Sequence, residues 1–154
     1  MIKILQHTAH RPWPLLAGPW IMKQEWHDLL FAHWAVPADV LCPLIPRALE
    51  IDTFDGSAWL GVVPFRMSGV RMRGMLPMPG LARFPELNVR TYVVRDGKPG
   101  VWFFSLDAAN ALAVWGARRA FHLPYFWAAM RCEEDSGWIC YESNRKHSGV
   151  PPAS

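Results

Sequence analysis

The chain has 154 residues and a formal net charge of +3, and 51% of its residues are hydrophobic while only 19% are charged. This balance excludes an intrinsically disordered chain, and the length suits one domain with a core of its own. The 14 prolines and 11 glycines interrupt the sequence too often for the long helices of a bundle. The basic residues form no run, so we expect no nucleic-acid partner.

The sequence carries no signal for a membrane, an export route or a metal. It has no stretch of the roughly 20 apolar residues that a membrane span needs, and the N-terminus has no apolar run of a secretory type. Cys42, Cys132 and Cys140 form no Cys-x-x-Cys pair, which favours a reducing compartment. His27 and His33 would lie about 20 Å apart on a strand, too far to share a metal. We therefore expect a cytoplasmic protein without a membrane partner, metal or other cofactor.

The first half of the chain predicts an irregular arm followed by short elements. Residues 1–19 hold three prolines and no sustained periodicity. The apolar residues 26–36 predict a buried strand that ends at Pro37, and residues 38–44 predict a short helix that stops at Pro46. The Asp55-Gly56 dipeptide is typical of a tight turn and predicts a hairpin between strands over 49–54 and 58–65.

The second half predicts further hairpins and the best helix of the chain. Residues 69–81 combine glycine, proline and methionine and predict a mobile loop, a candidate lid. A hairpin is expected from strands over 84–94 and 101–106, then a helix over 108–120 with Asp107 as its N-cap. A third strand pair over 125–131 and 138–141 precedes a flexible tail, 143–154. These elements predict one mainly β, α+β domain over residues 20–142.

Three polar residues alternate along the expected strand 84–94. Glu86, Asn88 and Arg90 occupy every second position, and Leu87 and Val89 lie on the other face. Two interpretations are open. The row is either a solvent-exposed sheet face or a polar lumen inside a curved sheet, where the charged groups need partners because an unpaired buried charge is costly. No Gly-x-Ser-x-Gly elbow and no phosphate loop accompanies it.

Five segments carry a resemblance to a known family: WHDLLFAHW (26–34), LEIDTFDG (49–56), AWLGVVPF (58–65), ELNVRTYV (86–93) and FSLDA (104–108). Through them, residues 20–132 resemble the bacterial YqjF-like domain of unknown function, a family related to the acetoacetate decarboxylase superfamily. The resemblance implies a closed, curved antiparallel β-barrel with one or two short helices and a lumen for a small acid. Family members continue past the position of Ser154, which implies a C-terminally truncated barrel whose open edges a second subunit covers, that is, a homo-oligomer.

The resemblance also bears on catalysis. The decarboxylase pattern around the reactive lysine is Gly-Arg-Glu, two residues, Gly, an aromatic residue and Pro-Lys-Lys. Residues 117–126 match its length, with Arg118 and Pro124 in register, but both lysine positions are occupied by Tyr125 and Phe126. A Schiff base needs an amine of lowered pKa, so the resemblance implies that Schiff-base decarboxylation is lost while Glu86 retains the position of the pocket glutamate.

Three functions remain open. The first is a barrel that binds a small carboxylate or apolar ligand, with Arg118 and Arg90 as anchors. The second is an enzyme in which Glu86 is the general base and Tyr125 the acid. The third is a non-catalytic interaction module. The expected ligand-binding residues are Glu86, Asn88, Arg90, Arg118, His122 and Tyr125.

Overall fold

One strongly curved β-sheet organises the chain. The computed structural model describes residues 8–9, 13–14, 17–76, 83–151 and 153. The sheet contains the strands β1 (Met22–His27), β2 (Ala32–Val36), β3 (Glu50–Ile51), β4 (Ala58–Met72), β5 (Arg83–Arg95), β6 (Lys98–Ala108), β7 (Tyr125–Asp135) and β8 (Trp138–Arg145). Its order is β1-β4-β5-β6-β7-β8, while β2 also pairs with β4 and β3 with β5.

The length of β4 sets the curvature of the sheet. This strand has 15 residues and pairs with β2 along its first part and with β1 along its last part. Pro64 lies where the partner of β4 changes from β2 to β1, and its carbonyl accepts a hydrogen bond from the backbone N–H of Leu30. On the other side of β5, Phe104 is an extra residue between the pairs Arg90–Phe103 and Val89–Ser105, a bulge that increases local twist.

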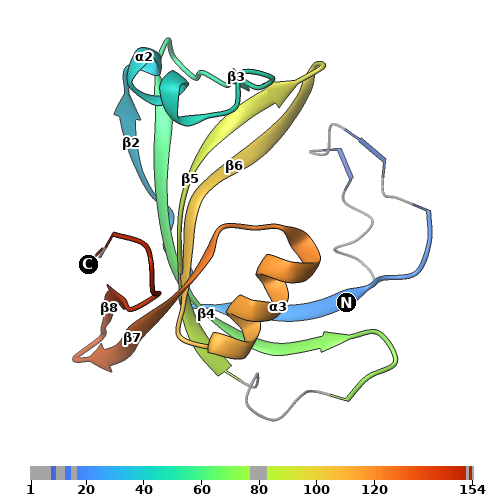
Figure 1. The fold of residues 1–154 in the computed structure, drawn as a ribbon, viewed down its shortest axis with the longest axis vertical. Coiled ribbons are helices and arrows are strands. Elements are labelled where there is room, and N and C mark those ends of the chain that lie inside the picture. The colour runs from blue at the N-terminus through green and yellow to red at the C-terminus, as the bar shows by residue number, and fades with distance from the viewer. Residues whose placement is uncertain (1–7, 10–12, 15–16, 77–82, 152, 154) are drawn as a thin grey trace.

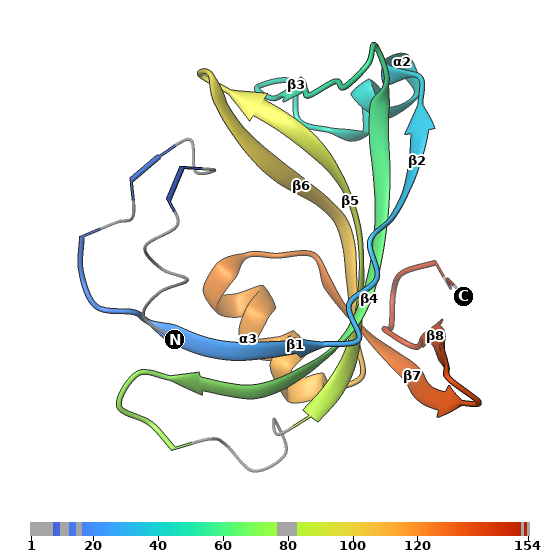
Figure 2. The same ribbon diagram turned by 180° about the vertical axis from the view of Figure 1, so that it is seen from behind.

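Two short helices accompany the sheet, as expected from the sequence. Helix α2 (Ala38–Leu41) follows Pro37 and continues into the 3-10 turn η1 (Cys42–Leu44). Helix α3 (Ala111–Phe121) begins later than predicted, because Asp107 belongs to β6 and the side chain of Asn110 accepts the capping hydrogen bond instead. Figures 1 and 2 show α3 inside the concave side of the sheet, between β5–β6 and β1, and the β7–β8 hairpin on the opposite side.

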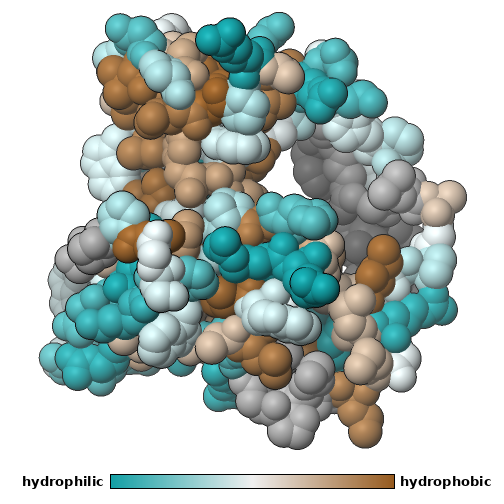
Figure 3. Space-filling view, in the orientation of Figure 1, coloured by the Kyte–Doolittle hydropathy of each residue, from teal (hydrophilic) through white to brown (hydrophobic). Residues whose placement is uncertain are grey.

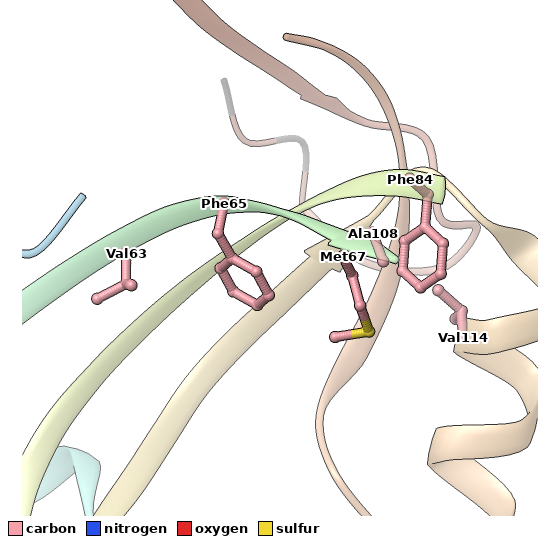
Figure 4. Packing of buried hydrophobic residues seen from close by; sticks show 6 residues of the cluster. All are labelled: Val63, Phe65, Met67, Phe84, Ala108 and Val114. Carbon is pink, nitrogen blue, oxygen red and sulfur yellow. The ribbon is translucent and has the colours of Figure 1, made fainter. Parts of the chain in front are cut away.

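The core lies between the concave face and α3. Alternate residues of β4 point to this face, and Figure 4 shows Phe65 and Met67 directed the same way, with Phe84 next to Val114 of the helix. The cluster consists of Val63, Phe65, Met67, Phe84, Ala108 and Val114. The structure therefore buries one face of three strands with a single helix.

The closed antiparallel barrel is not formed. In the described part of the chain, the sheet begins at β1 and β2 and ends at β8, and these end strands do not pair with one another. The sheet is also mixed, because β6 and β7 pair in parallel. The α3 crossover that connects them is the kind of connection that parallel strands require.

Three expected elements have different bounds or partners. The single strand over 26–36 is interrupted at Asp28, which has a positive φ of 51°, so β1 and β2 are separate strands. The hairpin over 49–65 is absent: β3 pairs with β5, and the Asp55-Gly56 turn closes only the isolated bridge Phe54–Ser57. In the expected loop 69–81, β4 continues to Met72, and residues 77–81 lie outside the described residues.

Long-range polar contacts attach the last hairpin to the sheet. Strand β8 extends into the segment expected as a tail, and Arg145 donates from Nε and Nη2 to Oδ1 of Asp107 at 3.0 and 2.7 Å. The side chain of Asp107 is buried, at 4% exposure, and that of Arg145 is mostly covered, at 13%. Tyr141 donates its hydroxyl to the carbonyl of Asp28 at 2.8 Å. No helix within the described ranges is long and apolar enough to cross a membrane.

Replacing Arg145 with methionine is expected to lower the free energy of unfolding by about 3–5 kcal/mol, because Asp107 would stay buried without its cation. The matched control is Arg131→Met in the same hairpin, whose ion pairs with Glu133 and Glu142 are exposed. That change should cost about 0–1 kcal/mol. Urea unfolding followed by circular dichroism measures both, and equal losses would contradict the structural role of the Arg145–Asp107 pair.

Candidate functional site

A row of polar side chains lies on the concave face of β5. Glu86, Asn88 and Arg90 occupy alternate positions, as the sequence predicted, and Tyr92 continues the row. Glu86 and Asn88 are only 2% and 4% exposed. Of the two interpretations of this alternation, the solvent-exposed sheet face is therefore wrong for these two residues.

The buried end of the row is surrounded by apolar side chains. Glu86 lies between its register partners Phe65 on β4 and Ala108 on β6, both of which belong to the core. Asn88 lies in the same way between Val63 and Leu106, which are also buried. Neither polar side chain can therefore turn sideways to reach water.

Within the part of the chain that the structure describes, three atoms of the row have no hydrogen-bond partner. They are Glu86 Oε2, Asn88 Oδ1 and Arg90 Nε, and all three are buried. Buried polar groups are normally paired, and leaving one unpaired costs about 1–3 kcal/mol. Because these atoms belong to consecutive positions of one strand face, they mark a place that can accept the polar groups of a ligand.

Tyr125 is the hydrogen-bond partner of Glu86. Residue Tyr125 starts β7 and pairs in parallel with Leu106, so its side chain reaches Glu86, and its hydroxyl donates to Oε1 at 3.0 Å. Burial raises the pKa of Glu86 to about 7, although the hydrogen bond from Tyr125 opposes this change. Burial, together with the charge of Glu86 and their hydrogen bond, raises the pKa of Tyr125. Glu86 can therefore exchange a proton near neutral pH.

Aromatic rings hold the side chain of Arg90 at the other end of the row. Its Cζ lies 5.1 Å from the ring centre of Phe31 and 5.7 Å from that of Tyr92. The hydroxyl of Tyr92 is 3.5 Å from Nη2 of Arg90 and 2.7 Å from Nε2 of His33. Phe31 is half exposed, so the row runs from a partly buried arginine beside an exposed ring to the buried carboxyl of Glu86.

Gly61 leaves the space that this aromatic arrangement needs. It pairs with His33 on β2 and with Arg90 on β5. A Cβ atom at this position would lie 3.0 Å from Nε2 of His33 and 3.4 Å from Cγ of Arg90. A side chain here would displace the histidine from Tyr92.

Arg118 and His122 lie outside the row. Arg118, an expected anchor for a ligand carboxylate, donates from Nη1 to the backbone carbonyl of Tyr125 at 2.7 Å. His122 ends α3 in the left-handed conformation. Both residues line a hollow of about 1040 Å³ on the outer side of α3. The six expected ligand-binding residues are thus divided between two places, four in or beside the row and two along this hollow.

Sequence reasoning missed three residues of the site. Tyr92 could have been found, because it continues the alternation of Glu86, Asn88 and Arg90. Phe31 and His33 have no local signal, since they reach Arg90 only through the pairing of β2 with β4. Among the residues that the structure describes, no group of three or more His, Cys, Asp or Glu side chains is placed to hold a metal ion.

The raised pKa of Glu86 predicts a pH-dependent stability. Below pH 4.5, the usual pKa of this group, the carboxyl is protonated in both states; between 4.5 and about 7 only the unfolded chain releases the proton. Stability is therefore lost as the pH rises, and the cost reaches about 3 kcal/mol above pH 7. The free energy of unfolding of Glu86→Gln, measured by urea unfolding relative to the wild type, should therefore rise by this amount between pH 4 and pH 8. A difference independent of pH would contradict the raised pKa.

Comparisons with known proteins identify the fold. The acetoacetate decarboxylase of Legionella pneumophila superposes with a TM-score of 0.63 at 13% identity, over 96% of this chain and 54% of that chain. The enduracididine biosynthesis enzyme MppR, in complex with pyruvate, superposes with a TM-score of 0.57 at 14% identity, over 90% and 56%. The chain therefore has an acetoacetate decarboxylase-like fold, here with an open sheet.

Sequence comparison identifies the family. The uncharacterized protein YqjF of Bacillus subtilis (strain 168) is 52% identical over 130 residues, which are 84% of this chain and 54% of that protein. The chain thus spans about half the length of the relatives it matches. The model of the DUF2071 family, described as an uncharacterized conserved protein, matches residues 23–153. This chain belongs to the DUF2071 family.

Proposed function

We propose that this protein binds a small organic carboxylate in the polar row of β5. Arg90 receives the carboxylate, and Asn88 and Glu86 receive a hydroxyl or another hydrogen-bonding group of the same molecule. The observation that carries the proposal is the set of three buried, unpartnered atoms on these three residues. A ligand that formed hydrogen bonds with these atoms would remove the cost of leaving them unpaired.

The environment of Arg90 favours a carboxylate over a neutral ligand. A guanidinium is always charged and matches the geometry of a carboxylate. In the described part of the chain Arg90 forms no ion pair, and the rings of Phe31 and Tyr92 restrict its side chain before any ligand arrives. Such preorganisation lowers the entropy cost of binding. The similar fold of MppR was solved with pyruvate, which supports a small carboxylate as the first probe.

Asn88 and Glu86 would form hydrogen bonds with the part of the ligand that lies away from its carboxylate. Asn88 Oδ1 is an acceptor and requires a donor from the ligand, whereas Glu86 Oε2 can accept or donate according to its protonation. Alternate residues of a strand are about 7 Å apart, so a molecule of a few carbon atoms reaches from Arg90 to Asn88. A hydroxy acid has this combination of groups.

The proposed binding involves no Schiff base. The side chain that contacts Glu86 is Tyr125, which has no amine. The lysines in the described ranges lie elsewhere: Lys23 pairs with Glu25, Lys98 lies over the ring of Trp13, and Lys146 lines the hollow beside α3. Ligand binding would therefore be non-covalent.

A second candidate function is acid–base catalysis at the same place. It is supported by the 3.0 Å hydrogen bond between Tyr125 and Glu86 and by the pKa of about 7 for Glu86. A carboxyl with that pKa can take a proton from a bound acid and return it. Exchange of ligand protons with deuterated water, abolished by Glu86→Gln, distinguishes this function from binding alone. If the protein is a non-catalytic interaction module, the third function considered from the sequence, it would bind no small carboxylic acid in the row.

Replacing Arg90 with glutamine is expected to weaken carboxylate binding roughly 10- to 100-fold, because one charge-assisted hydrogen bond contributes about 1.5–3 kcal/mol. Titration calorimetry with pyruvate and 3-hydroxybutyrate measures the change. The matched control is Arg95→Gln on the same strand, whose pairing with Asp96 is exposed. Borohydride should trap no adduct with pyruvate. Absence of binding, or equal binding by the Arg90 variant, would refute the proposed site.

We also propose that the chain self-associates through the β1–β2 edge of the sheet, with a second copy of the chain as the partner. This edge pairs with no further strand in the described ranges, and Trp26, Leu30 and Trp34 are exposed along it. An exposed strand edge with apolar side chains is prone to pairing. Sedimentation velocity at micromolar concentration should show a dimer that Trp34→Glu dissociates and Trp138→Glu on β8 does not. A wild-type monomer at all concentrations would refute it.

A further inference from the structure

The hollow on the outer side of α3 is a second concave site, separate from the polar row. We call it the α3 hollow. Its lining comes from one side of α3 along the length of the helix, from the start of β7 and from the segment that follows β8. It is lined by Ala111, Val114, Trp115, Arg118, Arg119, His122, Trp127, Lys146, His147 and Ser148. Its volume of about 1040 Å³ is at the upper end of the usual range for small-molecule sites.

The ionisable side chains described in the lining of the α3 hollow are all basic. This lining contains two arginines, one lysine and two histidines but no carboxylate. Within the described residues, neither Arg119 nor Lys146 forms an ion pair, in contrast to Lys23 and Arg145. Figure 3 shows hydrophilic surface gathered over α3. Among the described side chains that line the hollow, no carboxylate accompanies this positive charge.

Part of this charge has a structural explanation. Arg118 and Arg119 lie in the last turn of α3, where cations complement the helix dipole, and Arg118 also donates to the Tyr125 carbonyl. A helix terminus accounts for about half of one elementary charge. Lys146 comes from a different segment, and its backbone N–H is bonded to the carbonyl of Trp127, which fixes it opposite the helix. The helix dipole can therefore explain the arginines of α3, but it does not explain why Lys146 from another segment lines the same hollow.

Two tryptophans add flat apolar surface to the basic lining. Trp115 is 64% exposed on α3, and Trp127 is 41% exposed on β7. Exposed indole faces of this kind stack on planar rings, whatever the identity of the ring. The wall that carries them is well anchored, because Nδ1 of His147 accepts a hydrogen bond from the backbone of Trp127. The ion pair with Asp107 holds Arg145, the residue directly before Lys146, in place.

We infer that the α3 hollow binds a planar aromatic phosphate of the size of a nucleoside monophosphate. Arg119 and Lys146 contact the phosphate, and Trp115 or Trp127 stacks on the ring. The inference is independent of the carboxylate proposed for the polar row, because it uses none of the row's side chains. Phosphate is preferred over a monocarboxylate because two full positive charges and two imidazoles converge without any acid.

Titration calorimetry with AMP tests the inference. AMP should bind saturably at low salt, and adenosine and inorganic phosphate should each bind about tenfold more weakly or worse, because each lacks one of the two contacts. The double variant Arg119→Ala/Lys146→Ala should weaken AMP binding by at least about tenfold. Trp115→Ala/Trp127→Ala should weaken binding of AMP but not of inorganic phosphate.

Three controls make the result specific. Arg95→Ala/Lys98→Ala removes the same charge from the exposed end of the β5–β6 hairpin and should leave AMP binding unchanged. Glu86→Gln should also leave it unchanged, whatever its effect on carboxylates. Thermal melts of all variants exclude unfolding. The inference is overturned if wild-type protein shows no saturable AMP binding up to about 1 mM, if both double charge variants bind alike, or if a short single-stranded oligonucleotide binds more tightly than AMP.

Discussion

The bend of β4 is the constraint on which the rest of the structure depends. A straight strand of 15 residues would leave its neighbours in one flat layer, whereas this one exchanges β2 for β1 as its partner along its length. The concave face that results is deep enough for α3 to pack against the core cluster, whose Phe65 and Ala108 flank Glu86. Burial of Glu86, and hence its altered acidity, follows from that geometry rather than from any local motif.

The same bend explains why costly polar groups persist inside the sheet. Glu86 and Asn88 occupy positions whose neighbours on both sides are apolar, so replacing them by apolar residues would fit the core well. Gly61 likewise sacrifices side-chain packing to admit His33 and Arg90. A protein that keeps polar and small residues at such positions is giving up stability locally, a pattern that is common at functional sites.

The sequence predicted those features that depend on neighbours along the chain. The alternation of Glu86, Asn88 and Arg90 was correct because a strand has a period of two, and the β5–β6 hairpin was correct because its turn is short. Asp107 was misjudged as a helix cap because its true partner, Arg145, lies 38 residues away. The partner of β3 was wrong for a similar reason, since a turn signal at Asp55-Gly56 says nothing about β5.

For the site residues too, the sequence indicated some positions but not the contacts that depend on distant parts of the chain. Tyr125 was placed beside Glu86 through a family resemblance, and the structure brings the two together at 3.0 Å. Arg118 was in register with the family pattern, but register does not determine the direction of a long side chain at the end of a helix, and its guanidinium reaches a backbone carbonyl instead. Phe31 and His33 required knowledge of the sheet order.

The hydrogen bond from Tyr141 to Asp28 joins residues 113 positions apart. It fastens the last strand of the sheet to the interruption between the first two, so nearly the whole described chain must be in place before it can form. Contacts of such separation carry a large loop-closure cost and are associated with slow folding. The sheet therefore assembles against an entropic barrier that its topology sets, and the contact between its outermost strands contributes to that barrier.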